Sequence, residues 1–157
     1  GHEWRAEAYS WSQDNETVTA ALVCVRDENH TSEEIVGVRR VATVSPTQTT
    51  EGEYKFVSKP FETEACEAQE KSGGIIPALG TLTKPIFPAN LTVIEAEAFE
   101  GTPFQAVIIP STVTTVGSRA FADCQNLVYV YIPASVTSLA ADAFDNCPNV
   151  IVDRAGE

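Results

Sequence analysis

Four cysteines and two histidines are the side chains of this 157-residue chain with the greatest capacity for chemistry. Five residues separate Cys24 from His30, and His2 or Cys66 could supply further ligands to a zinc ion. This spacing is loose, because structural zinc sites usually combine tight C-x2–4-C or H-x3–5-H pairs. We therefore interpret His30 as a turn residue and predict no metal site.

The sequence gives little support for catalysis. Neither histidine lies beside a nucleophile motif such as G-x-S-x-G, which a serine or cysteine hydrolase would need. The regular acidic run of Glu62, Glu64, Glu67 and Glu70 has no evident apolar pocket that would raise a carboxyl pKa, so we interpret it as a solvated strand edge. No glycine-rich phosphate-binding motif occurs. We predict a non-enzymatic protein that uses no cofactor.

Composition and charge exclude further classes of function. The chain has 22 acidic and 10 basic residues, a formal net charge of −12, and 43% hydrophobic residues, which is enough for a packed core. The negative charge repels phosphate backbones and anionic lipids, which disfavours nucleic-acid and membrane-surface partners. Prolines and polar residues interrupt the longest uncharged runs, so no transmembrane helix and no membrane insertion are predicted.

The charge density falls in the middle of the chain. Residues 1–72 carry 14 acids and 7 bases, whereas residues 73–157 carry 8 acids and 3 bases. Two glycines at the join are followed by Pro77, which disfavours a continuing helix or central strand. We predict a domain over 1–72, a linker over 73–85 and a second domain over 86–157.

The first segment favours β structure. Its apolar residues alternate with polar ones, and turn-forming residues interrupt them at intervals. A small all-β domain is expected, either an immunoglobulin-like sandwich or an open barrel. The candidate strands cover residues 4–11, 17–25, 33–44, 53–58 and 61–69.

The second segment contains an internal repeat. Pro88, Pro110 and Pro133 are separated by 22 and 23 residues, and the same spacings separate three Ala-Phe pairs that end at Phe99, Phe121 and Phe144. Each unit is expected to hold a strand, a proline corner and a short helix around the Ala-Phe pair. One strand cannot bury its own apolar face, so about three units must stack as a leucine-rich repeat β/α solenoid, with the phenylalanines inside.

The cysteines fall into two pairs. Cys24 and Cys66 lie on separate predicted strands, where they form either a disulfide in an exported protein or two buried thiols. Cys124 and Cys147 occupy the same position in adjacent repeats, where side chains point in parallel, so we expect both to stay thiols. Any disulfide is therefore expected to join Cys24 to Cys66.

Two tyrosines are the candidate binding residues. Tyr129 and Tyr131 alternate with apolar residues on one repeat strand, which places both rings on the same face. Both are expected to point outward, onto the surface that curved solenoids use for binding. The expected inward set is Phe104, Val107, Ile109, Leu127, Val130 and Ile132.

The repeats resemble a known family. The pattern is Val113-x-x-Val116-Gly117-x-x-Ala120-Phe121-x-x-Cys124-x-x-Leu127-x-x-Val130-x-Ile132-Pro133. Over about residues 86–152 it is similar to the BspA-like (Treponema-type) leucine-rich repeat of bacterial surface proteins. The first unit departs from the family pattern, with Thr102 in place of the cysteine and Phe104 arriving one residue early. The resemblance implies an extracellular, cell-surface location and adhesion to a host or bacterial extracellular protein or glycan.

The N-terminal segment also resembles a family. Its pattern is His2-x-Trp4, Tyr9-Ser10-Trp11-Ser12-x-Asp14, Val18-Thr19-Ala20, Val23-Cys24, Asp27 and His30-Thr31. This is similar to a short extracellular β-repeat in surface proteins of gut Firmicutes. That family usually places a second cysteine near Pro46-Thr47, where this chain has Gln48, so the family's cysteine pairing does not carry over.

Three functions stay open on the sequence. The first is non-catalytic adhesion, or protein or glycan binding, through the repeats of a bacterial surface protein. The second is a purely structural stalk or spacer within a larger surface protein. A hydrolase acting on surface polymers comes third, and it would need a convergent pair of carboxylates in a cleft.

Overall fold

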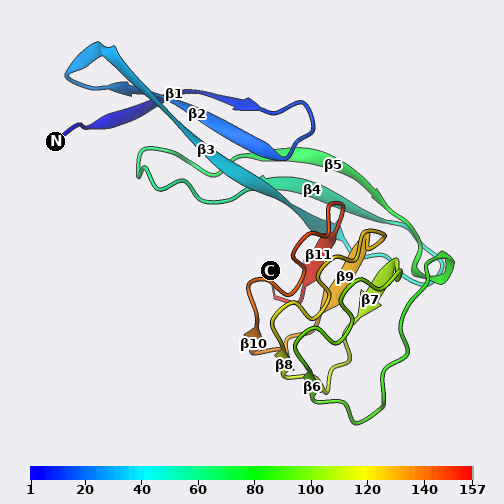
Figure 1. Cartoon of the computed structure of the whole chain (residues 1–157). Coiled ribbons are helices and arrows are strands. Elements are labelled where there is room, and N and C mark those ends of the chain that lie inside the picture. The colour runs from blue at the N-terminus through cyan, green and yellow to red at the C-terminus, as the bar shows by residue number, and fades with distance from the viewer. Residues whose placement is uncertain (157) are drawn as a thin grey trace. The chain divides into compact units, whose positions relative to one another are not determined.

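The computed structural model describes residues 1–156, and its regular secondary structure is almost entirely strand, joined by many turns (Figure 1). No α-helix occurs among these residues; one 3-10 turn, η1, covers Leu79–Thr81. The strands are β1 (Trp4–Trp11), β2 (Thr17–Cys24), β3 (Asp27–Val44), β4 (Gly52–Ser58), β5 (Glu70–Ile76), β6 (Val93–Ile94), β7 (Ala106–Ile108), β8 (Thr115–Val116), β9 (Tyr129–Ile132), β10 (Ser138–Leu139) and β11 (Ile151–Arg154).

The described chain forms two compact units. The first combines Gly1–Arg40 with Lys55–Gly73, and the second combines Val41–Tyr54 with the chain from Gly74 onward. The second unit therefore contains the repeats together with residues 41–54, which come from a distant part of the sequence.

The first unit is organised by antiparallel pairing. β2 pairs with β1 on one side and with β3 on the other. Alternation along β2 buries Val18, Ala20 and Leu22, as a period of two predicts for a half-buried strand. The register of β2 with β3 shifts between Val23 and Cys24, which is a bulge at the end of the strand.

Two expectations for the β segment are wrong. Strands β1 to β5 all belong to one sheet, in which β4 pairs with β3 and with β5, so neither a two-sheet sandwich nor a barrel forms. Residues 61–69 form no strand, and the fifth strand is β5. β5 includes the two glycines that the sequence assigned to a linker. At Gly74 a Cβ atom would lie 3.2 Å from the Tyr54 ring, so glycine is used there to pack an aromatic ring against the strand.

The second unit contains two ladders of parallel strands from the repeats (Figure 1). One has the strand order β11, β9, β7, with β3 next to β11 in the same sheet, and the other has the order β10, β8, β6. Ala106 pairs with Tyr129, and Tyr129 pairs with Ile151. Each repeat thus gives one strand to each ladder, which confirms the prediction of parallel stacking and adds a second, shorter strand per repeat.

The predicted helices around the Ala-Phe pairs are wrong, and so is the β/α class of the repeats. These segments are turns whose N–H groups alternate between two kinds of acceptor. Ala120 N–H donates to Gly117 O within its own turn, whereas Phe121 N–H donates to Ala143 O of the next repeat. An α-helix would need each N–H to reach the carbonyl four residues earlier. Arg119 also has a φ of 55°, which interrupts helical geometry.

The phenylalanine ladder forms as expected. The ring centroids of Phe99 and Phe121 are 5.2 Å apart, with an angle of 6° between the ring planes. Those of Phe121 and Phe144 are 5.4 Å apart, with an interplanar angle of 8°. Phe121 is fully buried. Its core cluster includes Val107, Ile109, Leu127, Val130 and Ile132, which the sequence placed inside.

We predict that Phe121→Ala destabilises the protein by about 3–5 kcal/mol, because the surrounding stack cannot collapse into the cavity. The midpoint of urea unfolding measures this loss. Phe104→Ala is the control, because Phe104 is only partly buried and lies outside the core cluster. Equal effects of the two substitutions would contradict the interior role of the ladder.

We also predict that Gly117→Ala destabilises by about 1–3 kcal/mol through overpacking. A Cβ atom there would lie 2.6 Å from the backbone nitrogen of Ala96 in the preceding repeat, so the two turns would have to separate. Gly101→Ala meets no atom within 4 Å but has a φ of 71°, so it measures backbone strain alone. An effect of Gly117→Ala no larger than that of Gly101→Ala would show that the repeats are not held this closely.

Candidate functional site

The turns of the repeats carry an acidic surface, which we call the acidic turn face: Glu97, Glu100, Asp123, Asp142 and Asp145, around Arg119. Arg119 Nη2 lies 2.7 Å from Glu100 and 2.8 Å from Asp123, and Nη1 lies 3.6 Å from Asp145. These groups belong to different repeats, so stacking brings them together. The single guanidinium leaves the face with an excess of negative charge.

Backbone geometry fixes where these side chains lie. Gly101, Asp123 and Asn146 occupy equivalent positions in the three repeats, and all three have a positive φ, of 71°, 57° and 54°. Asparagine and aspartate adopt this conformation more readily than other non-glycine residues. Asn146 Nδ2 donates to Asp123 Oδ1 at 2.6 Å, and this bond is the main cause that holds the pKa of Asp123 below its ordinary value. Asp123 is therefore a carboxylate at neutral pH.

Asp142 connects the turns of two repeats. Its carboxylate accepts hydrogen bonds from the Ser118 hydroxyl at 2.8 Å and from the Arg119 backbone N–H at 3.3 Å. The serine hydrogen bond contributes most to lowering the pKa of Asp142. One carboxylate of the acidic turn face therefore orients the backbone of the neighbouring repeat.

Tyr129, one of the two tyrosines expected to be exposed, is buried. Its side chain is 2% exposed and packs against Ile76, Leu79, Ala106 and Ile151. The expectation of an outward, solvent-facing ring is therefore wrong for Tyr129. Tyr131 is partly exposed, and its binding role stays a prediction.

The cover over Tyr129 comes from residues far away in the sequence. Ala42 and Tyr54 pack against the same cluster, and Ser45 donates a 2.6 Å hydrogen bond to Asp153. The Tyr129 hydroxyl donates to the same Asp153 carboxylate. Alternation along a strand shows only that both rings share a face, and it cannot show what covers that face.

All four cysteines are free thiols in the structure, and the expectation that any disulfide would join Cys24 to Cys66 stays a prediction. Cys66 is partly buried beside Tyr9 and Glu34, and burial raises the pKa of its thiol. Cys24 has a different neighbour, His2. The two predicted partners thus sit in separate surroundings of the first unit.

The two repeat cysteines have a structural role. Cys124 Sγ donates to Phe99 O at 3.3 Å, and Cys147 Sγ donates to Phe121 O at 3.1 Å. Each thiol therefore bonds to the preceding repeat. Burial raises the pKa of Cys147 to about 11, so this thiol stays protonated and unreactive at neutral pH.

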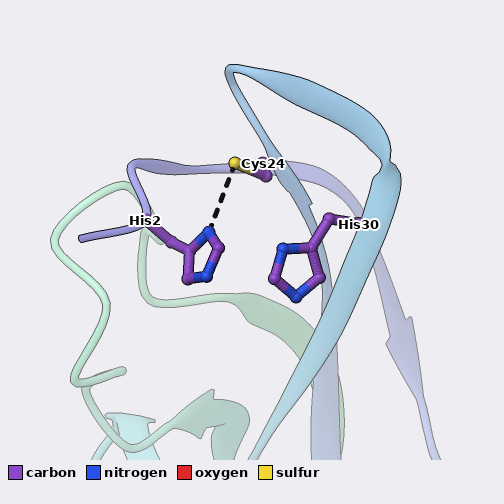
Figure 2. Close-up of side chains that lie close together, drawn as sticks. All are labelled: His2, Cys24 and His30. Atoms are coloured by element: carbon purple, nitrogen blue, oxygen red, sulfur yellow. Dashed lines mark hydrogen bonds between the residues drawn. The ribbon is translucent and has the colours of Figure 1, made fainter.

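A cluster of possible metal ligands lies in the first unit, where the sequence predicted no metal site. The ligand atoms of His2, Cys24 and His30 all lie within 4.8 Å of one another (Figure 2). His30 belongs to β3 rather than to a turn, because the connection after β2 is only two residues long. Judged along the sequence, the spacing of Cys24 and His30, with His2 as a further ligand, is too loose to predict zinc.

A family model covers the repeats. Residues 79–152 match the BspA type leucine rich repeat region, which is described with six copies. No curated protein matches the chain. Within residues 1–156, no helix is long and apolar enough to cross a membrane.

The buried Tyr129 predicts a loss of stability at alkaline pH. Burial, and then the hydrogen bond to Asp153, raise the pKa of Tyr129 above its ordinary value of about 10. Above pH 10 the Tyr129 hydroxyl loses its proton in the unfolded chain but keeps it in the folded protein. The contribution of Tyr129 to the free energy of unfolding is therefore complete below pH 10 and decreases above it. We expect urea midpoints measured from pH 8 to 11 to fall less steeply for Tyr129→Phe than for the parent.

Tyr131→Phe is the matched control, because it removes the hydroxyl of a neighbouring tyrosine that is only partly buried. At pH 7, Tyr129→Phe should cost about 1–2 kcal/mol, because Asp153 loses a donor. An unchanged alkaline slope in Tyr129→Phe would contradict the buried, protonated state.

Proposed function

Because residues 79–152 are a BspA-type leucine-rich repeat region, we propose that the chain is a non-catalytic binding segment of a bacterial surface protein. Leucine-rich repeats of this type are typically protein-interaction modules, and the proteins that carry them are typically surface-associated. The proposed ligand is an extracellular protein with a basic surface patch. The acidic turn face is the proposed contact surface.

The charge pattern of the repeats carries this proposal. Between Glu95 and Asp145 the sequence contains six acidic residues and a single basic residue, Arg119. Glu100 and Asp123 keep about a third of their side-chain surface exposed, and Asp145 is 63% exposed. Carboxylates held on a rigid stack keep their mutual spacing without a partner, so little conformational entropy is lost when one binds.

Electrostatic complementarity supports the choice of partner. An acidic surface accelerates encounters with a basic partner and disfavours acidic ones, and salt screens both effects. Tyr131 is partly exposed on β9 and packs against the same cluster as Tyr129, so its proposed binding role belongs to the β9 face and not to the acidic turn face. Tyr129 is buried in the core cluster beside the repeats, so it takes no part in the proposed contact.

The acidic turn face predicts binding that depends on charge. Asp123→Asn combined with Asp145→Asn should lower the association rate constant for basic extracellular matrix proteins roughly three- to tenfold at low salt. The difference should shrink at 0.5 M salt, because screening removes the attraction. Biolayer interferometry with immobilised basic and acidic matrix proteins measures both effects.

Glu64→Gln with Glu67→Gln is the matched control, because it removes the same charge from exposed positions in the first unit. It should bind like the parent. Equal losses in both double variants would show that net charge matters and the turn face does not. If neither basic nor acidic proteins bind, the structural spacer is the better explanation.

A further inference from the structure

Three strands of the first unit bring two imidazoles and a thiol together at one end of their sheet. His2 lies two residues before β1, Cys24 is the last residue of β2, and His30 belongs to the start of β3. Figure 2 shows the two rings beside each other with the Cys24 sulfur next to both. The cluster involves no residue of the repeats and does not depend on the proposed binding function.

The strand register explains why these residues meet. Trp4 of β1 pairs with Cys24, which brings the nearby His2 close to the end of β2. Cys24 pairs with Asp27 of β3 after the bulge that follows Val23. Val23 pairs with Thr31, the residue after His30, so the register shift leaves His30 on β3 close to Cys24.

The distances fit a shared metal ion. Cys24 Sγ lies 3.7 Å from His2 Nδ1. Zinc bonds of about 2.3 Å to sulfur and about 2.1 Å to nitrogen, at a tetrahedral angle, place those two atoms about 3.6 Å apart. The His2 and His30 ring centroids are 4.2 Å apart, and both side chains are exposed, so the rings can turn to point at the same ion.

The donor set selects the metal. Imidazole nitrogen and thiolate sulfur suit zinc, whereas magnesium and calcium prefer oxygen ligands. We propose that His2, Cys24 and His30 bind a zinc ion, with water in the fourth position. Three protein ligands with one open position is an established arrangement for zinc.

The position of Cys24 suits a metal ligand. Its sulfur lies at the end of β2, within hydrogen-bonding distance of His2 Nδ1. A thiolate is the species that coordinates zinc, so zinc binding would release the thiol proton. Cys24 is also 2% exposed, which keeps the sulfur in a fixed position.

A zinc ion at this position would join the ends of three strands. Binding to the folded state alone raises stability with metal concentration, so zinc should raise the midpoint of thermal unfolding. The centroid of the Trp4 ring lies 5.4 Å from that of His2 and 5.2 Å from that of His30. The site therefore borders an aromatic cluster, and metal binding would fix the positions of its rings.

Cobalt substitution tests the site directly. The untagged full chain, reduced with a phosphine and freed of metal by a chelator, is titrated with Co²⁺. We expect one equivalent to produce thiolate-to-cobalt charge-transfer absorption and the visible bands of a tetrahedral ion, and one equivalent of Zn²⁺ to remove them. Absence of the charge-transfer band in the parent protein would overturn the proposal.

Variants locate the ligands. His2→Ala and His30→Ala change exposed side chains, and each should weaken zinc binding by more than about tenfold. Loss of a residue that only supports a metal ligand already lowers metal affinity by about tenfold or more, so loss of a ligand should lower it further. Cys24→Ser should lose the charge-transfer band, and Cys66→Ser, the matched control, should keep it. Retention of parental affinity in both histidine variants would refute the site, as would loss of the band in Cys66→Ser.

Discussion

The repeat unit depends on how each turn divides its backbone hydrogen bonds. Phe99 and Phe121 donate their N–H groups to the next repeat, while Ala98 and Ala120 donate within their own turns. Buried backbone donors must find acceptors, so no turn can satisfy itself without its neighbour. This shared bonding fixes the distance between repeats. It requires glycine at position 117 and stacks the phenylalanine rings almost parallel.

The same constraint leaves the first repeat without a preceding neighbour, and other residues take that place. Gln105 and Ala106 donate their N–H groups to Thr83 O, and the Gln105 side chain accepts from the Thr83 N–H. On the face that carries Tyr129, Ala42, Tyr54 and the Ile76–Leu79 segment bury the ladder. Three repeats are close to the minimum that is stable alone, so these additions supply contacts that a longer array would obtain from further repeats.

The sequence predicted the features that depend on periodicity and missed those that depend on long-range contacts. The spacing of the Ala-Phe pairs gave the parallel stacking and the buried Phe121, because a regular period reports which residues become neighbours. Helix was predicted around the same pairs because short apolar segments fit both helix and turn, and only the inter-repeat hydrogen bonds distinguish them. The burial of Tyr129 depends on residues 41–54, whose position no local pattern reveals. His2, Cys24 and His30 were considered as zinc ligands and rejected because their spacing was judged along the chain, whereas a strand register brings the three residues together.

The stacking of the turns also determines the charge of the surface. Equivalent residues of successive repeats lie beside one another, so their charges accumulate in columns. Arg119 occupies the position that Glu97 and Asp142 hold in the neighbouring repeats, and it contacts acids from three successive repeats. Exposed ion pairs contribute little to stability individually. The main effect of Arg119 is therefore to reduce repulsion within the column, which allows the face to keep a net negative charge while the repeats stay in close contact.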